Sequence, residues 1–288
     1  MAQQASLSLA SVNFENRPAR RMSHRSAVAL FVLCSVPILP MPDVRSAEKA
    51  STSTESSLSR AFTDKQKGVF FANLSASQWN LHLGTGTKFA PLGTRDEAGW
   101  RLMLTSGTKF RERDPLIAGR FNRSEGGRVL AGYEGRIGNM TVSAFAGASL
   151  SVASPFEQGL TNRASRFGAV GLLEVWQNWP SRQQIPSGFT AATVLVDSAE
   201  GSAFFRVRHG VDLGFHGIAI GPELSISAGE ARKWRSVTIR DNWLKARAGL
   251  HIHGLRLGRL GLSVSGGYEF RRGEKGSPYG ELTTLWFY

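Results

Sequence analysis

The sequence predicts an all-β chain that folds as an antiparallel up-and-down β-barrel of about twelve strands in a bacterial outer membrane. Three features predict this fold. Windows of roughly ten residues carry apolar side chains at every second position, as a strand requires when one face meets lipid and the other meets a lumen. The 32 glycines are spread along the chain, as in a protein of strands and tight turns. The sequence ends on an alternating segment whose last residue, Tyr288, is aromatic.

The clearest alternation runs through residues 260–271. One face of this window is apolar and carries Leu260, Leu262, Val264, Tyr268 and Phe270. The opposite face is polar and carries Ser263, Ser265, Glu269 and Arg271. Because successive side chains of a strand point to opposite sides, we expect one face toward lipid and the other toward a polar interior.

Further windows of the same kind give the number of strands. The pattern is clear at 205–213, 218–227 and 244–253, and weaker windows lie at 79–89, 98–109, 126–136, 141–151, 166–179 and 188–196. Adding 68–75 and 279–288 gives about twelve strands, an even number as in bacterial outer-membrane barrels. A soluble β-sandwich, which also alternates, is the rival fold.

The connections between these windows fit hairpins. Tight turns are expected at Gly138-Asn139, Glu200-Gly201 and His216-Gly217. Longer polar stretches at 110–125, 152–165 and 229–236 are interpreted as extracellular loops. Pro222 falls inside a strand window, and since proline has no N–H for the sheet, we expect a strand end or a bulge there.

The final predicted strand places four residues on one face: Leu282, Thr284, Trp286 and Tyr288. Such a strand resembles the segment that the barrel-assembly machinery recognises, so these four residues are the candidate assembly signal. An ordinary buried strand at the end of the chain would show the same alternation.

The first 47 residues have the three regions of a secretory signal. Basic residues come first: Arg17, Arg20, Arg21 and Arg25. An apolar run of about 13 residues follows at 27–39, too short to span a bilayer. We expect cleavage after Ser46 or Ala47, with an uncleaved anchor as the alternative and Met22 as an alternative start. Residues 48–66 are then a flexible polar leader, and residues 67–288 form the barrel domain.

The charge balance and the cysteine content exclude several classes of function. The formal net charge is +13, and residues 1–47 contribute only +3 of it. Such an excess suits nucleic acid, anionic lipid or an acidic ligand. Because no nucleic-acid-binding motif accompanies it, we expect a basic rim beside an anionic membrane and no nucleic-acid partner. The single cysteine, Cys34, lies in the N-terminal apolar run, so no disulfide or thiol catalyst is expected.

The polar strand faces supply the candidate lumen residues. These are Glu174, Arg206, Arg208, Glu223, Lys245, Arg247, His251, His253 and Glu269. In a narrow barrel such opposite charges pair across the interior and fill it, whereas in a wider barrel they select a solute. The ion-paired interior is the reading we favour.

The same residues offer two chemical sites. His251 and His253 share a strand face and could bind a metal, but no third ligand lies nearby in the sequence, so no metal is expected. Ser263, His251 and Glu223 could converge as the serine, histidine and acid of an acyl hydrolase. In a chain with so many serines such triples arise by chance, and we expect neither an enzyme nor a cofactor.

Four short motifs carry a family resemblance: Gly168-Ala169-Val170 leading to Leu173-Glu174-Val175-Trp176, then Gly221-Pro222-Glu223, Gly266-Gly267-Tyr268 and Ser277-Pro278-Tyr279-Gly280. Through them, the region from residue 68 to 288 resembles the cellulose biosynthesis protein BcsS family of alphaproteobacteria. The resemblance implies an outer-membrane component of cellulose synthesis or secretion, without established catalytic residues. We interpret the motif residues as architectural, with Trp179 suited to an interfacial girdle.

This resemblance sets the expected function and partners. We expect a non-enzymatic accessory protein that contacts outer-membrane lipid, the barrel-assembly machinery, and either cellulose synthase and export components or the glucan chain. A neutral glucan requires aromatic platforms, and Phe145 and Trp176 are the inward candidates. A small diffusion pore is the alternative function, and a barrel acyl hydrolase acting on outer-membrane lipid is a third.

Overall fold

The computed structural model describes residues 66–112, 121–154, 164–181, 186–214, 217–230, 232–234, 237–240, 243–273 and 275–288. The expected signal at 1–47 and all but the last residue of the expected leader lie outside these ranges. Within them, no helix is long and apolar enough to cross a membrane.

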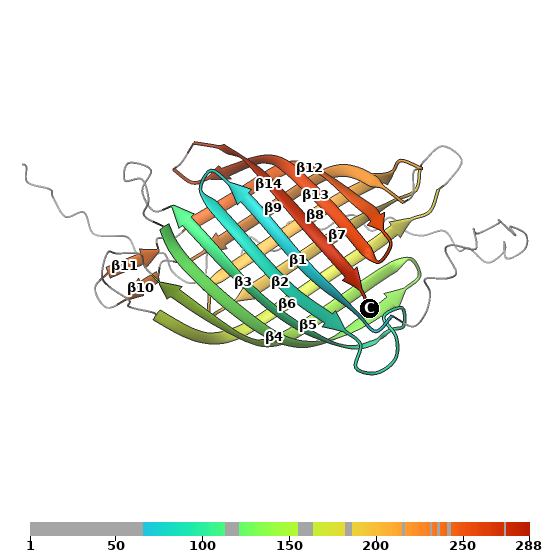
Figure 1. The fold of residues 1–288 in the computed structure, drawn as a ribbon, viewed down its shortest axis with the longest axis horizontal. Coiled ribbons are helices and arrows are strands. Elements are labelled where there is room, and N and C mark those ends of the chain that lie inside the picture. Colours follow the sequence, from blue (N-terminus) through green and yellow to red (C-terminus); the bar gives the residue numbers. More distant parts are fainter. Residues whose placement is uncertain are drawn as a thin grey trace, which may run out of the picture. The chain divides into compact units, whose positions relative to one another are not determined.

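Twelve antiparallel strands close into one barrel, which confirms the predicted fold class (Figure 1). In chain order they are β1 Gly68–Ser77, β2 Asn80–Phe89, β3 Gly99–Glu112, β4 Phe121–Ile137, β5 Met140–Ser154, β6 Ala164–Trp179, β7 Gly188–Asp197, β8 Ser202–Asp212, β9 Ala219–Gly229, β12 Trp243–Leu257, β13 Leu260–Arg271 and β14 Ser277–Phe287. Each barrel strand pairs with the next one in the chain. A separate hairpin, β10 Arg232–Trp234 and β11 Val237–Arg240, lies between β9 and β12 in the sequence.

Pairing of the first and last strands closes the barrel. The β1–β14 ladder runs from Val69 opposite Phe287 to Ser77 opposite Tyr279. The backbone N–H groups of Lys67 and Gly68 also donate to the carbonyl oxygen of Tyr288, at 3.0 and 3.1 Å. Closure pairs every strand on both sides, so the barrel presents no free sheet edge.

The long loops predicted from the sequence are shorter in the structure. β3 extends to Glu112 and β4 begins at Phe121, so much of the stretch 110–125 is strand, and 152–165 is shortened in the same way by β5 and β6. The stretch 229–236 contains β10. A membrane-spanning strand needs only about 9–11 residues, whereas β4 has 17. Polar residues beyond the apolar part of a strand therefore continue its ladder.

The tight turns at Gly138 and Gly201 are confirmed. Both glycines have positive φ, of 57° and 55°, and each lies between consecutive antiparallel strands. Glycine favours these positions because a side chain would strain the left-handed backbone conformation. His216 of the third predicted turn lies outside the described residues.

The expectation of a strand end or bulge at Pro222 is wrong. Pro222 lies within β9 and pairs in register with Leu250 of the neighbouring strand β12. On the β8 side, the ladder stops at Arg208 opposite Glu223 and resumes in the same register at Val211 opposite Ile220. The missing N–H thus leaves a local gap in one ladder, and no residue is inserted.

The even number of strands places the start of β1 and the end of β14 at one end of the barrel. This end, which we call the terminal end, also carries the connections at 90–98, 138–139, 180–187, 213–218 and 258–259. The opposite end carries those at 78–79, 113–120, 155–163, 198–201, 230–242 and 272–276, and we call it the loop end. All three predicted extracellular loops fall at the loop end.

The barrel wall has an apolar outer face and a polar inner face. Leu250 and Val129 are about 60% exposed on the outer face. His251 and Glu269, on the inner face, are buried. An apolar group in the interior consists of Met103, Leu130, Phe145, Val170 and Leu172, on β3 to β6. The remaining buried side chains are mainly serines and charged groups. Such a wall reverses the arrangement of a soluble protein and fits lipid outside.

Candidate functional site

The interior of the barrel holds a cavity of about 1040 Å³. All twelve barrel strands contribute to its lining, which reaches from Lys67 and Phe287 at the terminal end to Ser124 and Ser202 at the loop end. The charged lumen is therefore the candidate functional site. Most of its ion-paired side chains form three groups, which we describe in turn.

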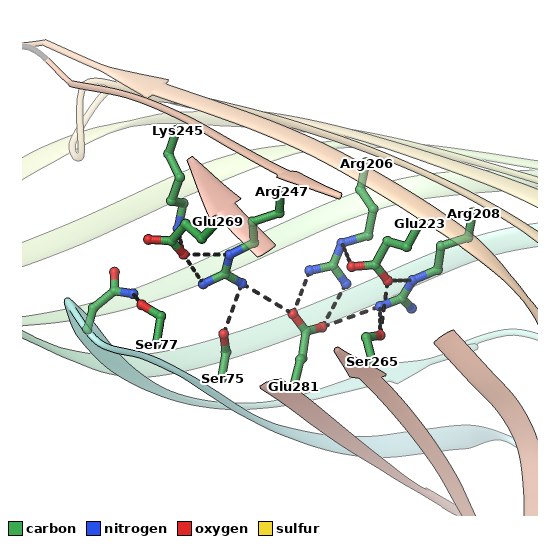
Figure 2. Close-up of polar contacts among 11 residues, drawn as sticks. Ser75, Ser77, Arg206, Arg208, Glu223, Lys245, Arg247, Ser265, Glu269 and Glu281 are labelled. Atoms are coloured by element: carbon green, nitrogen blue, oxygen red, sulfur yellow. Dashed lines mark hydrogen bonds and ion pairs between the residues drawn. The ribbon is translucent and has the colours of Figure 1, made fainter. Parts of the chain in front are cut away.

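The largest group is carried by β8, β9, β12, β13 and β14, and we call it the central ion cluster (Figure 2). It comprises Arg206, Arg208, Glu223, Lys245, Arg247, Glu269, Arg271 and Glu281. Five cations thus share three carboxylates. The sheet register assembles part of it directly, because Arg208 is opposite Glu223 and Arg247 is opposite Glu269.

Glu281 lies at the centre of this cluster, with its side chain 4% exposed. Arg206 donates two hydrogen bonds to it, from Nη1 to Oε1 at 2.8 Å and from Nη2 to Oε2 at 2.9 Å. Arg208 Nη2 lies 3.4 Å from Oε1, and Arg247 Nη1 lies 3.7 Å from Oε2. Three guanidinium groups therefore surround one carboxylate, which neutralises part of their charge.

Glu223 and Glu269 complete the cluster. Arg208 Nε and the Ser265 hydroxyl both donate to Glu223 Oε2, the latter at 3.0 Å. Arg247 contacts Glu269 Oε2 with Nε and Nη2, each at 2.7 Å. Arg271 Nε donates to the other oxygen at 2.8 Å. Because Arg206 on β8 and Glu281 on β14 belong to strands that are not neighbours, part of this cluster spans the interior.

A second group lies toward the terminal end, on β2 to β6. Lys88 Nζ bridges Glu134 at 2.8 Å and Glu174 at 3.3 Å. Arg101 Nη2 lies 3.3 Å from Glu134, and the Ser143 hydroxyl donates to the same carboxylate at 2.9 Å. Two cations balance two carboxylates in this group.

A third group lies toward the loop end. Arg128 contacts Asp197 at 2.7 Å and Glu200 at 3.1 Å, and Lys109 contacts Glu200 at 3.2 Å. Ser149 donates to Asp197 at 2.8 Å. This group is also neutral, so the lumen is charge-balanced near the loop end.

Aromatic and histidine rings form a further group toward the terminal end. Trp176 stacks on Phe189 with ring centroids 4.2 Å apart and planes 10° apart. The ring of His253 is 5.4 Å from Trp176 and 5.3 Å from Phe189, and His251 is 5.6 Å from Phe189. The two histidines predicted to share a face thus pack against aromatic rings.

The three residues considered for a hydrolase make other contacts. The Ser263 hydroxyl donates to the backbone carbonyl of Ile252 at 3.1 Å. Glu223 is engaged by Arg208 and Ser265, and neither ring nitrogen of His251 has a hydrogen-bond partner. A working triad requires the serine, histidine and acid to bond to one another. Among the described residues, no cluster of three His, Cys, Asp or Glu side chains has the geometry for a metal ion.

The other predicted residues are placed as follows. Glu174, Arg206, Arg208, Lys245, Arg247 and His253 line the cavity, while Glu223, His251 and Glu269 are buried in the wall. Of the candidate assembly residues, Leu282, Trp286 and Tyr288 are exposed on the outer face and Thr284 is half-buried. Their recognition by the assembly machinery stays a prediction.

The two expected inward aromatic residues differ in their outcome. Trp176 lines the cavity, whereas Phe145 packs into the apolar group on β3 to β6 and does not line it. Among the described residues, five further aromatic side chains line the cavity: Phe71, Phe89, Phe204, Trp243 and Phe287.

Sequence reasoning missed several charged lumen residues. Glu281 alternates with the outward Leu282, so the pattern that gave the assembly signal also placed Glu281 inward. Lys67, Arg95 and Glu200 lie outside regular strands, and alternation gives no information about such positions.

An apolar outer wall around an ion-paired polar lumen defines this chain as a β-barrel of the transmembrane class. A family model described as cellulose biosynthesis protein BcsS matches residues 68–286. The chain belongs to this family.

Three solved structures align with most of this chain at low sequence identity. LpxR from Salmonella typhimurium is 10% identical, with a TM-score of 0.47 over 76% of this chain and 100% of that chain. The β domain of the Bordetella autotransporter BrkA is 14% identical, with a TM-score of 0.42 over 77% and 100%. The translocator domain of NalP from Neisseria meningitidis is 9% identical, with a TM-score of 0.40 over 80% and 92%. Among curated proteins, no relative matches this sequence.

Proposed function

We propose that this protein is a non-enzymatic outer-membrane accessory component of bacterial cellulose biosynthesis or secretion. Membership in the BcsS family is the observation that carries the proposal. The apolar outer face of the closed barrel supports an outer-membrane location, since closed barrels and helices are the structures that can span lipid. The ion pairs among the lumen side chains support a structural role.

The test of this proposal compares the source bacterium with a strain lacking the gene. We expect the protein in the outer-membrane fraction, and we expect its loss to reduce cellulose at the cell surface. Return of the wild-type gene restores the polymer. Unchanged cellulose in the deletion strain, with other cellulose genes expressed normally, contradicts the proposal.

A diffusion pore is the second candidate, and the cavity of about 1040 Å³ favours it. A space of this size, lined by polar side chains from both ends of the barrel, can hold a column of water. Planar-bilayer recording of the purified barrel tests this function. Discrete conductance steps are expected of a pore, and a folded barrel that stays silent excludes it.

The non-enzymatic part of the proposal has its own test. Ser263 and His251 form the alternative catalytic pair, so alanine at both positions leaves outer-membrane lipid composition unchanged if the protein is not an acyl hydrolase. Release of fatty acid by the wild-type protein, abolished in the double variant, contradicts this part.

A further inference from the structure

The charges of the lumen are distributed unevenly between its two ends. Four cationic side chains line the cavity at the terminal end: Lys67, Arg95, Arg136 and Arg256. We call these four the basic mouth. They come from the segment before β1, the β2–β3 connection, the end of β4 and the end of β12. Strands on different sides of the barrel thus bring positive charge to the same opening.

The basic mouth has little carboxylate to neutralise it. Within the described residues, Lys67 and Arg256 have neither an ion pair nor a side-chain hydrogen bond. Arg136 lies 3.8 Å from Asp96, whose side chain is 71% exposed. An ion pair so open to solvent is weak, because water and salt screen it. In the third group, toward the loop end, the lining cations Lys109 and Arg128 are by contrast paired at 2.7–3.2 Å.

Arg95 is the most enclosed member of the mouth. Its guanidinium carbon lies 4.4 Å above the ring of Phe287, and Nη1 donates to the Gln66 side chain at 3.4 Å. Burial lowers the pKa of Arg95, and the positive charges of Arg256 and Arg136 act in the same direction. The carboxylates of Asp96 and Glu134 act against them. All three guanidinium groups line the same cavity, and an anion placed among them offsets their positive charge.

The net charge of the whole cavity lining is also positive. Among the described residues, twelve lysine and arginine side chains line the cavity against four carboxylates, and four further carboxylates pair with these cations from outside the lining. An excess of four positive charges is left in a space enclosed by a low-dielectric wall. Such a space concentrates anions and excludes cations.

We propose that the lumen binds soluble anions that carry carboxylate or phosphate groups, and that the basic mouth is their point of entry. Guanidinium groups suit this chemistry because they donate pairs of parallel hydrogen bonds to these oxyanions. Trp176 lines the cavity toward the same end, with its ring stacked on Phe189. The site stands on the barrel geometry and does not depend on a role in cellulose production.

The test measures binding to the full chain, folded in an uncharged detergent, by isothermal titration calorimetry. Three probes separate the ligand chemistries: tetragalacturonate carries carboxylates, inorganic pyrophosphate carries phosphates, and cellotetraose is neutral. We expect at least one acidic probe to bind at least tenfold more tightly than cellotetraose. We also expect its affinity to fall as salt is raised from 50 to 500 mM, as charge attraction is screened.

Variants locate the site. Replacing Arg95 and Arg256 together with glutamine lowers the affinity for the acidic probe at least tenfold. The matched control replaces Arg259 and Arg272, which have exposed side chains outside the cavity lining, and it keeps wild-type affinity. Both double variants remove the same net charge. If the first variant does not fold, the exposed pair Lys67→Gln and Arg136→Gln serves in its place.

Three results overturn the proposal: neither acidic probe binds, cellotetraose binds as tightly as both of them, or the mouth and control variants lose affinity equally. Normal cellulose production in a deletion strain does not affect it, because that result addresses only the proposed role. The two proposals therefore fail on different measurements.

Discussion

At the scale of single residues, the lumen is organised around a few buried carboxylates. Glu281 is surrounded by Arg206, Arg208 and Arg247 at 2.8–3.7 Å. Without the Glu281 carboxylate, each of these guanidinium groups would carry an uncompensated charge in a confined space. Removing one partner of a buried ion pair costs more than the pair contributes, because the remaining charge loses its compensation.

Glu281→Gln is therefore expected to destabilise the barrel by about 3 kcal/mol. The glutamine has nearly the same shape, so the loss reports on charge rather than on packing. Urea-induced unfolding of the barrel in lipid vesicles measures the change. The matched control is Glu125→Gln on the β4 ion pair with Arg123, where both side chains are about half exposed.

The control is expected to cost less than about 1 kcal/mol, as exposed ion pairs do. Equal stability of the two variants would show that the central ion cluster does not hold the wall together.

At the scale of strands, the close approach of β8 and β9 beside Pro222 is the least regular feature of the wall. The ladder between these strands is interrupted opposite Pro222, while Gly221 stands directly against the neighbouring backbone. A Cβ at Gly221 would collide with the carbonyl oxygen of His209. This glycine is needed for strand contact rather than for an unusual backbone angle.

Gly221→Ala is expected to destabilise the barrel by about 1–3 kcal/mol, because backbone rather than a flexible side chain must move. Gly280→Ala on β14 is the control, since a Cβ there meets nothing within 4 Å. Alanine at that position is expected to be neutral or slightly stabilising. The fraction folded, read from the heat-dependent shift of the barrel in gel electrophoresis across a urea series, compares the two. A Gly221→Ala barrel as stable as the wild type would contradict the close approach.

The strands were predictable from the sequence for a physical reason. A wall between lipid and a polar lumen imposes a period of two on every strand, and residues 260–271 show it without interruption. Strand length was less predictable, since polar residues beyond the apolar part resemble a loop in sequence, as at 110–125. Pro222 was misjudged because its effect depends on which neighbouring strand its missing N–H faces.

The lumen was predictable only in part. Alternation identifies the inward face, and Arg208 and Glu269 follow from it. It does not identify partners, because the contact between Arg206 on β8 and Glu281 on β14 crosses the interior between strands that are not neighbours. Residues in connections, such as Arg95 and Glu200, line the cavity for reasons of three-dimensional placement alone.

At the scale of the whole molecule, the outer face determines where the barrel resides. Large apolar side chains are exposed on strand after strand, including Leu83 on β2, Val129 on β4 and Leu250 on β12. In water such a surface would aggregate, whereas in a bilayer it contacts lipid chains.

Leu250→Arg tests this placement, because Leu250 lies at the middle of β12 and is 59% exposed. An arginine at the mid-plane of a bilayer is expected to cost about 2–4 kcal/mol, and one near the interface about 0–1 kcal/mol. Leu213→Arg, in the connection after β8, is the control with a similar exposure of 53%. Folding equilibria in lipid vesicles give both values. Equal costs at the two positions would argue against a bilayer around the middle of the strands.

The central claim is that the outward side chains of the barrel strands meet lipid and the inward side chains meet the lumen. Nitroxide labels on Leu250→Cys and on Ser263→Cys, each in a Cys34→Ser background, test it most directly in vesicles by electron paramagnetic resonance. Leu250 faces outward, and Ser263 is buried and lines the cavity. We predict that the label at 250 is relaxed by oxygen, which dissolves in lipid, and that the label at 263 is not. Equal relaxation at both positions, or relaxation of the label at 250 by a water-soluble nickel chelate, would contradict the account.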